Sequence, residues 1–144
     1  MTSPNARPLA DGFYWILNNN NFLRAGNART VVSSTTVPQN ATKWHILFNA
    51  NDATYTIWNA DSDDIALDMP AGSDDVVTWK YHRSNPQPNQ KWAIRKTGVA
   101  YTLVPISRPT LVMAWKPNVV STAAAKDGAT NGQQWLIIPA PPRV

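Results

Sequence analysis

The sequence predicts an all-β fold in which one pattern of four short strands occurs three times. The tryptophans that each begin a short apolar run are 48 residues (44 to 92) and 43 residues (92 to 135) apart. An aromatic strand start and a Val-Val pair recur ahead of each tryptophan. The three sets are Trp44, Trp92, Trp135; Tyr14, Tyr55, Tyr101; and Val31-Val32, Val76-Val77, Val119-Val120. Markers that keep their order indicate three repeats, at about 11–50, 51–97 and 98–140.

Each repeat is expected to contain four strands, and the second repeat shows them most clearly. β-branched and aromatic residues gather at about 54–59, 65–69, 76–81 and 91–96. The segments between them are rich in Asn, Asp, Gly, Pro and Ser, the residues that form turns. Twelve short strands in three groups of four are compatible with a sandwich, a three-bladed propeller or a β-trefoil, although propellers typically have four to eight blades.

The length and composition of the chain suit a single globular unit. We expect residues 1–144 to form one domain with one core, because 43% of the residues are hydrophobic. The chain has no cysteine, which excludes a disulfide framework and a thiol nucleophile and suits a reducing compartment. The first 11 residues lack the apolar segment of a signal peptide, so we expect a cytoplasmic protein.

The charge and hydropathy of the chain bear on its partners. The net charge is +4 and the pI is about 9.6, but the basic residues are dispersed and form no run of Lys and Arg. We therefore expect no nucleic-acid partner. No segment approaches the roughly 18 consecutive apolar residues of a membrane span, so no membrane partner is expected either.

A repeated tripeptide distinguishes between the three all-β architectures. Gln90-Lys91-Trp92 and Gln133-Gln134-Trp135 resemble the Gln-x-Trp signature of ricin B-type domains, and Thr42-Lys43-Trp44 is a degenerate third copy. This resemblance implies a β-trefoil with three four-stranded repeats and a pseudo-threefold axis. It also implies that the three tryptophans lie in the shared core and do not contact a ligand.

The second repeat resembles the carbohydrate-binding repeat of that family. The family's sugar site consists of an Asp near the end of the second strand, an aromatic residue on the third, and an Asn ahead of the Gln-x-Trp. Asp68, Trp79 and Asn89 occupy these three places. We also expect Gln90 in the site, and Tyr81 is expected to extend its surface. The expected partner is a glycan that contains galactose, N-acetylgalactosamine or N-acetylglucosamine.

These side chains have the chemistry that sugar recognition needs. The two carboxylate oxygens of Asp68 can accept hydrogen bonds from adjacent hydroxyls, and such bonds are about twice as strong as neutral ones. The face of the Trp79 indole can cover the C–H face of a pyranose. Asn89 offers a donor and an acceptor. A substitution at Asp68 or Trp79 is expected to remove glycan binding while the fold persists.

The first and third repeats are expected to have no sugar site. The first repeat has Arg24, Ser34 and Ala41 in place of the Asp, the aromatic residue and the Asn. The third has Met113 or Ala114, Thr122 and Gly132.

Catalytic and metal-binding patterns are missing from the sequence. His45 is expected at the surface, on the opposite face of its strand from Trp44 and Ile46, and neither it nor His82 belongs to a triad pattern. The run from Asp61 to Asp64 does not match an EF-hand, because the sixth and twelfth positions hold Ala66 and Gly72. We therefore expect no enzyme, no metal and no cofactor.

A protease inhibitor is the alternative function. Fungal inhibitors of the Kunitz-like and mycocypin types share the β-trefoil scaffold, and an inhibitor of a serine or cysteine protease needs only a projecting loop. The basic candidates are Arg24 and Arg29, in one loop, and Lys126. The resemblance to fungal lectins suggests a defensive role. The apolar tail at 137–142 is a candidate surface for a homodimer.

Overall fold

The computed structural model describes residues 8–25, 33–35, 42–60, 65–72, 75–80, 87–116, 119–124 and 133–141, with the backbone alone for 33–35, 116 and 119–124. These residues form short strands and one 3₁₀ helix, η2 (Pro88–Gln90). The strands are β1 (Gly12–Asn18), β2 (Asn21–Arg24), β3 (Ser33–Thr35), β4 (Lys43–Asn49), β5 (Thr54–Asn59), β6 (Ile65–Asp68), β7 (Val77–Lys80), β8 (Trp92–Thr97), β9 (Ala100–Pro105), β10 (Leu111–Lys116), β11 (Val119–Ala124) and β12 (Leu136–Pro139). The four strands of the second repeat, β5 to β8, lie within one or two residues of the predicted ranges.

Six strands close into a ring. β1 pairs with β4, β4 with β5, β5 with β8, β8 with β9, and β12 with β1, all antiparallel. Two hydrogen bonds between Tyr101 and Trp135 complete the ring between β9 and β12, with N···O distances of 2.8 and 2.9 Å. A closed barrel leaves no exposed sheet edge along these strands.

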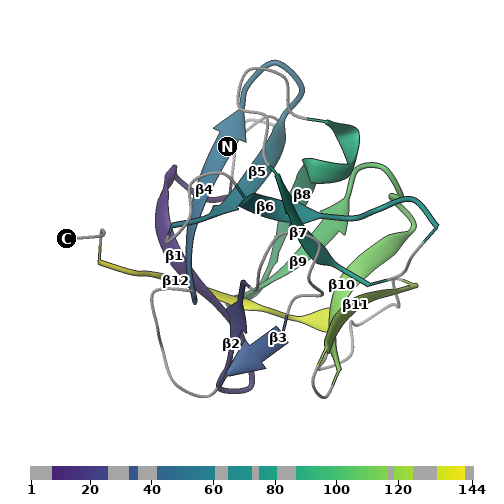
Figure 1. Cartoon of the computed structure of the whole chain (residues 1–144). Helices are drawn as coiled ribbons and strands as arrows, with labels where there is room; N and C mark the ends of the chain where they lie inside the picture. The colour runs from purple at the N-terminus through teal and green to yellow at the C-terminus, as the bar shows by residue number, and fades with distance from the viewer. Residues whose placement is uncertain are drawn as a thin grey trace.

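The remaining six strands form three hairpins, β2–β3, β6–β7 and β10–β11, one from each repeat (Figure 1). The prediction of three four-stranded repeats around a pseudo-threefold axis is confirmed, and the structure adds that each repeat supplies two barrel strands and one hairpin.

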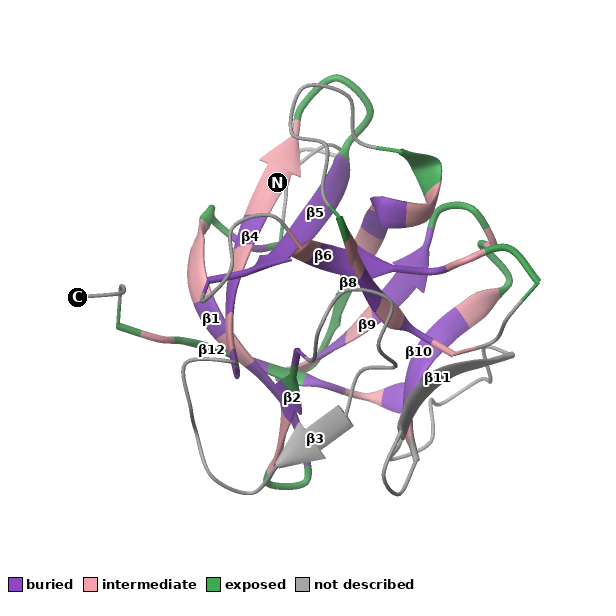
Figure 2. Ribbon diagram, in the orientation of Figure 1, coloured by how far each residue is buried: buried purple, intermediate pink, exposed green. Residues whose placement is uncertain are grey.

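The repeated aromatic residues are paired with one another on neighbouring strands of the barrel. Tyr14 pairs with Trp44, Tyr55 with Trp92 and Tyr101 with Trp135, each within its own repeat. All six side chains are buried. The sequence markers are therefore the central residues of three equivalent strand pairs, and the buried positions run along the barrel strands in Figure 2.

Each of the three tryptophans also holds a hairpin in place. Trp44, Trp92 and Trp135 are 0% exposed. Their indole Nε1–H groups donate to the backbone oxygens of Leu23, Leu67 and Met113, at 3.0, 3.2 and 3.0 Å. The acceptors lie on the first strand of each hairpin. The prediction that these tryptophans belong to the core is confirmed.

His45 corrects one expectation. It faces away from Trp44 and Ile46, which are both fully buried, as predicted. However, its side chain is half-buried and not at the open surface, because its ring stacks on Phe13 at 4.5 Å and lies 5.0 Å from the Trp58 ring. The outer face of β1, β4 and β5 carries this row of rings.

None of the helices in the described part of the chain is long and apolar enough to cross a membrane.

Replacing Trp92 by Phe is expected to lower the free energy of unfolding by about 2–4 kcal/mol. The change leaves the Leu67 carbonyl without its donor and opens space in a close-packed core. Urea unfolding of both proteins measures the difference. The exposed substitution Arg95→Gln on the same strand is the control and should stay within about 0.5 kcal/mol of the natural chain. A Trp92→Phe protein as stable as the control would contradict the anchoring role.

Candidate functional site

The β6–β7 hairpin has two different faces. Leu67 lies opposite Thr78, and both side chains are fully buried against the core. Since successive side chains of a strand point to opposite faces, the neighbours Asp68, Val77 and Trp79 face the other way. Asp68 lies directly opposite Val77, and Trp79 is two residues further along β7. The pleat of the hairpin therefore brings a carboxylate and an indole to one face.

Two side-chain amides hold the carboxylate of Asp68. Its Oδ1 accepts a hydrogen bond from Nδ2 of Asn89 at 2.8 Å, and its Oδ2 accepts one from Nε2 of Gln90 at 3.2 Å. Asp68 is only 2% exposed. Each carboxylate oxygen has two lone pairs, so each retains one acceptor position for a further donor.

Gln90 lies behind Asp68. The same Nε2 group that donates to Asp68 also donates to the backbone oxygen of Lys80 at 2.8 Å, and the residue is 1% exposed. Gln90 therefore cross-links the end of β7 to the carboxylate on β6. It is a positioning residue for Asp68 and not part of the surface that a ligand reaches.

Asn89 is placed by η2 and by a backbone hydrogen bond. Its carbonyl oxygen accepts from the Met69 N–H at 2.8 Å, immediately after β6. Pro88 begins the 3₁₀ helix, where its missing N–H costs nothing. The half-buried Asn89 is thus attached to β6 by its backbone and by its side chain.

The three predicted residues line one cavity of about 210 Å³. Its walls are formed by Asp68, Pro70, Ala71, Val77, Trp79 and Asn89. The predicted residues Asp68, Trp79 and Asn89 are therefore brought together, although they are up to 21 residues apart in the chain (68 to 89). Sequence reasoning missed Pro70, Ala71 and Val77. The position of Val77 opposite Asp68 could have been deduced only with the hairpin register. Tyr81 lies outside the described residues.

Burial sets the electrostatics of the site. Loss of solvent raises the pKa of Asp68 above its ordinary value of 3.8, and the hydrogen bonds from Asn89 and Gln90 oppose this rise without cancelling it.

The other two repeats lack an equivalent of Asp68. The indole hydrogen bonds make Leu23, Leu67 and Met113 equivalent, so the residues that follow them, Arg24, Asp68 and Ala114, are equivalent as well. This excludes Met113 as the third-repeat counterpart of the Asp and selects Ala114.

The counterparts of Trp79 differ by one residue from those expected. Trp79 lies opposite Ala66, and the equivalent pairs are Phe22 with Thr35 and Val112 with Ala123. Thr35 and Ala123, and not Ser34 and Thr122, therefore take the aromatic position. The expectation of no aromatic residue there still holds. The expected counterparts of Asn89, Ala41 and Gly132, lie outside the described residues.

The structure also corrects the proposed inhibitor loop. Arg24 is exposed, but it is the last residue of β2 and pairs with Ser33, so it does not lie in a projecting loop. A paired strand residue is a poor candidate for insertion into a protease pocket. Arg29 and Lys126 lie outside the described residues.

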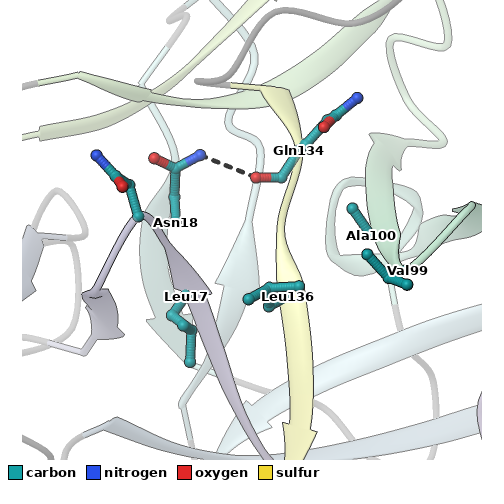
Figure 3. Close-up of a pocket in the computed structure, with 7 residues that line it drawn as sticks. Leu17, Asn18, Val99, Ala100, Gln134 and Leu136 are labelled. Atoms are coloured by element: carbon teal, nitrogen blue, oxygen red, sulfur yellow. Dashed lines mark hydrogen bonds between the residues drawn. The ribbon is translucent and has the colours of Figure 1, made fainter.

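A second cavity, of about 350 Å³, lies between the β1–β2 turn, the β8–β9 turn and the start of β12 (Figure 3). The described residues that line it have aliphatic and amide side chains, and none of them is charged or aromatic. Asn18 donates through Nδ2 to the backbone oxygen of Gln134 at 2.8 Å, and Asn59 makes the equivalent bond to Lys43 at 3.2 Å. Because the bond occurs in two repeats, Asn18 has a structural role.

Among the described residues, no group of three or more His, Asp or Glu side chains is arranged to hold a metal ion. The aspartates between 61 and 64 lie outside the described residues.

Replacing Asp68 by Ala is expected to lower the free energy of unfolding by about 1–3 kcal/mol, because two amide donors lose their acceptor. The fold is still expected to persist, but with a measurable loss of stability, because Asp68 is buried. Asp11→Ala is the control, since that residue is exposed and its Oδ1 accepts from the Phe48 N–H at 2.9 Å at the surface; it should cost no more than about 1 kcal/mol. Equal losses in the two variants would show that Asp68 is not structurally held.

The raised pKa of Asp68 predicts a pH effect on stability. A carboxyl whose folded-state pKa exceeds its unfolded-state value favours folding most when it is protonated, and this contribution is lost as the pH rises through the folded pKa. The stability of the natural chain relative to Asp68→Asn should therefore fall as the pH rises from 3.8 toward neutrality. Denaturant unfolding of both proteins across this range tests the sign. A relative stability that rises with pH would contradict it.

Comparison with known proteins identifies the fold. No family model and no curated protein matches the sequence. Among solved structures, a mosquitocidal holotoxin superimposes with a TM-score of 0.81 at 17% identity, over 92% of this chain and 18% of the toxin. The Polyporus squamosus lectin, bound to a Neu5Acα2-6Galβ1-4GlcNAc epitope, gives a TM-score of 0.71 at 17% identity, over 90% of this chain and 49% of the lectin. The BEL β-trefoil gives 0.74 at 8% identity, over 92% of this chain and 96% of that one. The chain thus spans only about a fifth of the holotoxin, and at these identities the likeness establishes the fold: the chain is a β-trefoil.

Proposed function

We propose that this protein binds glycans through the cavity on the β6–β7 hairpin. The observation that carries the proposal is the placement of the Asp68 carboxylate, the Asn89 amide and the Trp79 indole around one cavity of about 210 Å³. Ligand pockets commonly combine an apolar lining with a few polar groups that fix orientation. A cavity of this size suits one sugar ring.

The chemistry of the lining favours a neutral ligand with several hydroxyls. Asp68 is held as an acceptor and keeps one free acceptor position on each oxygen, which two adjacent hydroxyls can fill. The half-buried Trp79 presents apolar surface on the same face of the hairpin. A sugar has both kinds of surface, because its hydroxyls and its C–H groups lie on different sides of the ring.

Binding without catalysis follows from the same lining. Most glycosidases use two carboxylates that flank the scissile bond. Asp68 is the one carboxylate among the described residues that line the cavity. We therefore propose a binding module.

The Polyporus squamosus lectin supports the proposal by analogy, since it has the same fold and its structure contains a bound glycan epitope. In the present chain we assign one site, to the second repeat, because Arg24 and Ala114 replace Asp68 elsewhere. One site per chain cannot cross-link cells, so agglutination would require a dimer.

Removing the site is expected to remove binding. On a glycan array, the natural chain should bind a subset of glycans, whereas Asp68→Asn and Trp79→Ala should lose at least about tenfold in affinity, the effect of losing a charge-assisted hydrogen bond or a buried aromatic contact. Arg24→Ala is the matched control, because it changes the position equivalent to Asp68 in the first repeat and should bind as the natural chain does.

Circular dichroism must show that each variant is folded. Folded Asp68→Asn and Trp79→Ala proteins that bind as tightly as the natural chain would disprove the site assignment. A natural chain that binds no glycan would disprove the function.

A further inference from the structure

The composition of the cavity wall distinguishes between classes of sugar. The polar groups, Asp68 and Asn89, come from the end of β6 and from η2. The rest of the wall is carbon: Pro70 and Ala71 from the turn after β6, and Val77 and Trp79 from β7. Gly72, next to Ala71, has a φ of +79°, a conformation that favours glycine. The cavity wall thus combines two polar residues with four that are largely apolar.

A plain hexose matches only part of this wall. Trp79 can cover the C–H face of the ring, and Asp68 can accept from two hydroxyls. The remaining apolar groups, Pro70, Ala71 and Val77, would then lie against hydroxyls. A hydroxyl that loses water without gaining a hydrogen bond weakens binding. A sugar with a methyl-bearing substituent avoids this loss, because the methyl group gains from burial against the same groups.

Asn89 indicates which substituent the cavity fits. Its Nδ2 donates to Asp68, and its backbone oxygen accepts from Met69. Its side-chain oxygen takes part in none of the hydrogen bonds made by the described residues. Asn89 lines the cavity, and an amide oxygen such as its Oδ1 can accept a hydrogen bond from an amide N–H. An acetamido group carries both an N–H and a methyl group, whereas a 6-deoxy sugar offers only the methyl.

We infer that the cavity selects 2-acetamido sugars, with the acetamido N–H donating to Oδ1 of Asn89 and its methyl group against Pro70, Ala71 and Val77. This inference rests on the proposed function and adds the class of sugar to it. Val77 is then a specificity-determining residue, since it lies directly opposite Asp68 in the hairpin and lines the same cavity.

Titration calorimetry with four monosaccharides tests the inference: N-acetylgalactosamine, N-acetylglucosamine, galactose and L-fucose. The better of the two acetamido sugars should bind about tenfold more tightly than galactose, the effect of one well-placed methyl-sized group in an apolar pocket. L-fucose, which has a methyl group but no acetamido N–H, should bind no better than galactose.

Val77→Thr supplies the mutational test, because it exchanges one methyl of the wall for a hydroxyl and keeps the shape of the side chain. It should reduce the preference, measured as the ratio of the affinities of the same variant for the acetamido sugar and for galactose, to about twofold. Val99→Thr is the matched control: it makes the same exchange at a residue that is 84% exposed, on the β8–β9 turn, and should keep the preference of the natural chain.

The outcomes separate the inference from the function on which it rests. Equal affinities of the natural chain for galactose and both acetamido sugars, L-fucose binding as tightly as an acetamido sugar, or an unchanged preference in Val77→Thr would each overturn the inference and leave glycan binding in place. If no monosaccharide binds at millimolar concentration and no glycan binds on the array, the proposed function fails and the inference fails with it.

Discussion

The hydrogen bond from each buried indole to a hairpin carbonyl is the constraint on which the rest of the structure depends. A tryptophan that is completely buried needs an acceptor for its N–H, because an unpaired polar group in the core costs about 1–3 kcal/mol. In this chain the acceptor is always on the first strand of a hairpin. In each of the three repeats, the same bond therefore gives the buried indole N–H its acceptor and fixes the hairpin on the barrel.

The candidate site depends on this constraint directly. Leu67 accepts the indole hydrogen bond of Trp92, and the next residue is Asp68. Because side chains alternate along a strand, the bond that turns Leu67 toward the core turns Asp68 away from it. Gln90, two residues before Trp92, then reaches both Asp68 and the end of β7. The Gln-x-Trp tripeptide thus has two roles in the second repeat: Trp92 anchors the hairpin and Gln90 orients the carboxylate.

A symmetric scaffold can therefore carry an asymmetric site. The three repeats share the barrel pairs and the indole bonds, which set the positions that follow Leu23, Leu67 and Met113. These positions face away from the core and are free to vary, and they hold Arg24, Asp68 and Ala114. The apolar wall formed by Pro70, Ala71 and Val77 is likewise local to the second repeat, and so the selection of a ligand can change in one repeat without any change to the core.

The sequence by itself determined the number of repeats, the strands of the second repeat, the core tryptophans and the trio of Asp68, Trp79 and Asn89. These features follow from the spacing of large aromatic residues and from a resemblance carried by a short motif. Only the tertiary structure decided that Asp68 is buried, that Gln90 lies behind it, that Ala114 is its third-repeat counterpart, and that Thr35 and Ala123 take the place of Trp79. The physical reason is that these facts depend on strand register and on contacts between segments far apart in the chain. A shift of one residue reverses the face of every side chain in a strand, and sequence spacing alone does not fix that register.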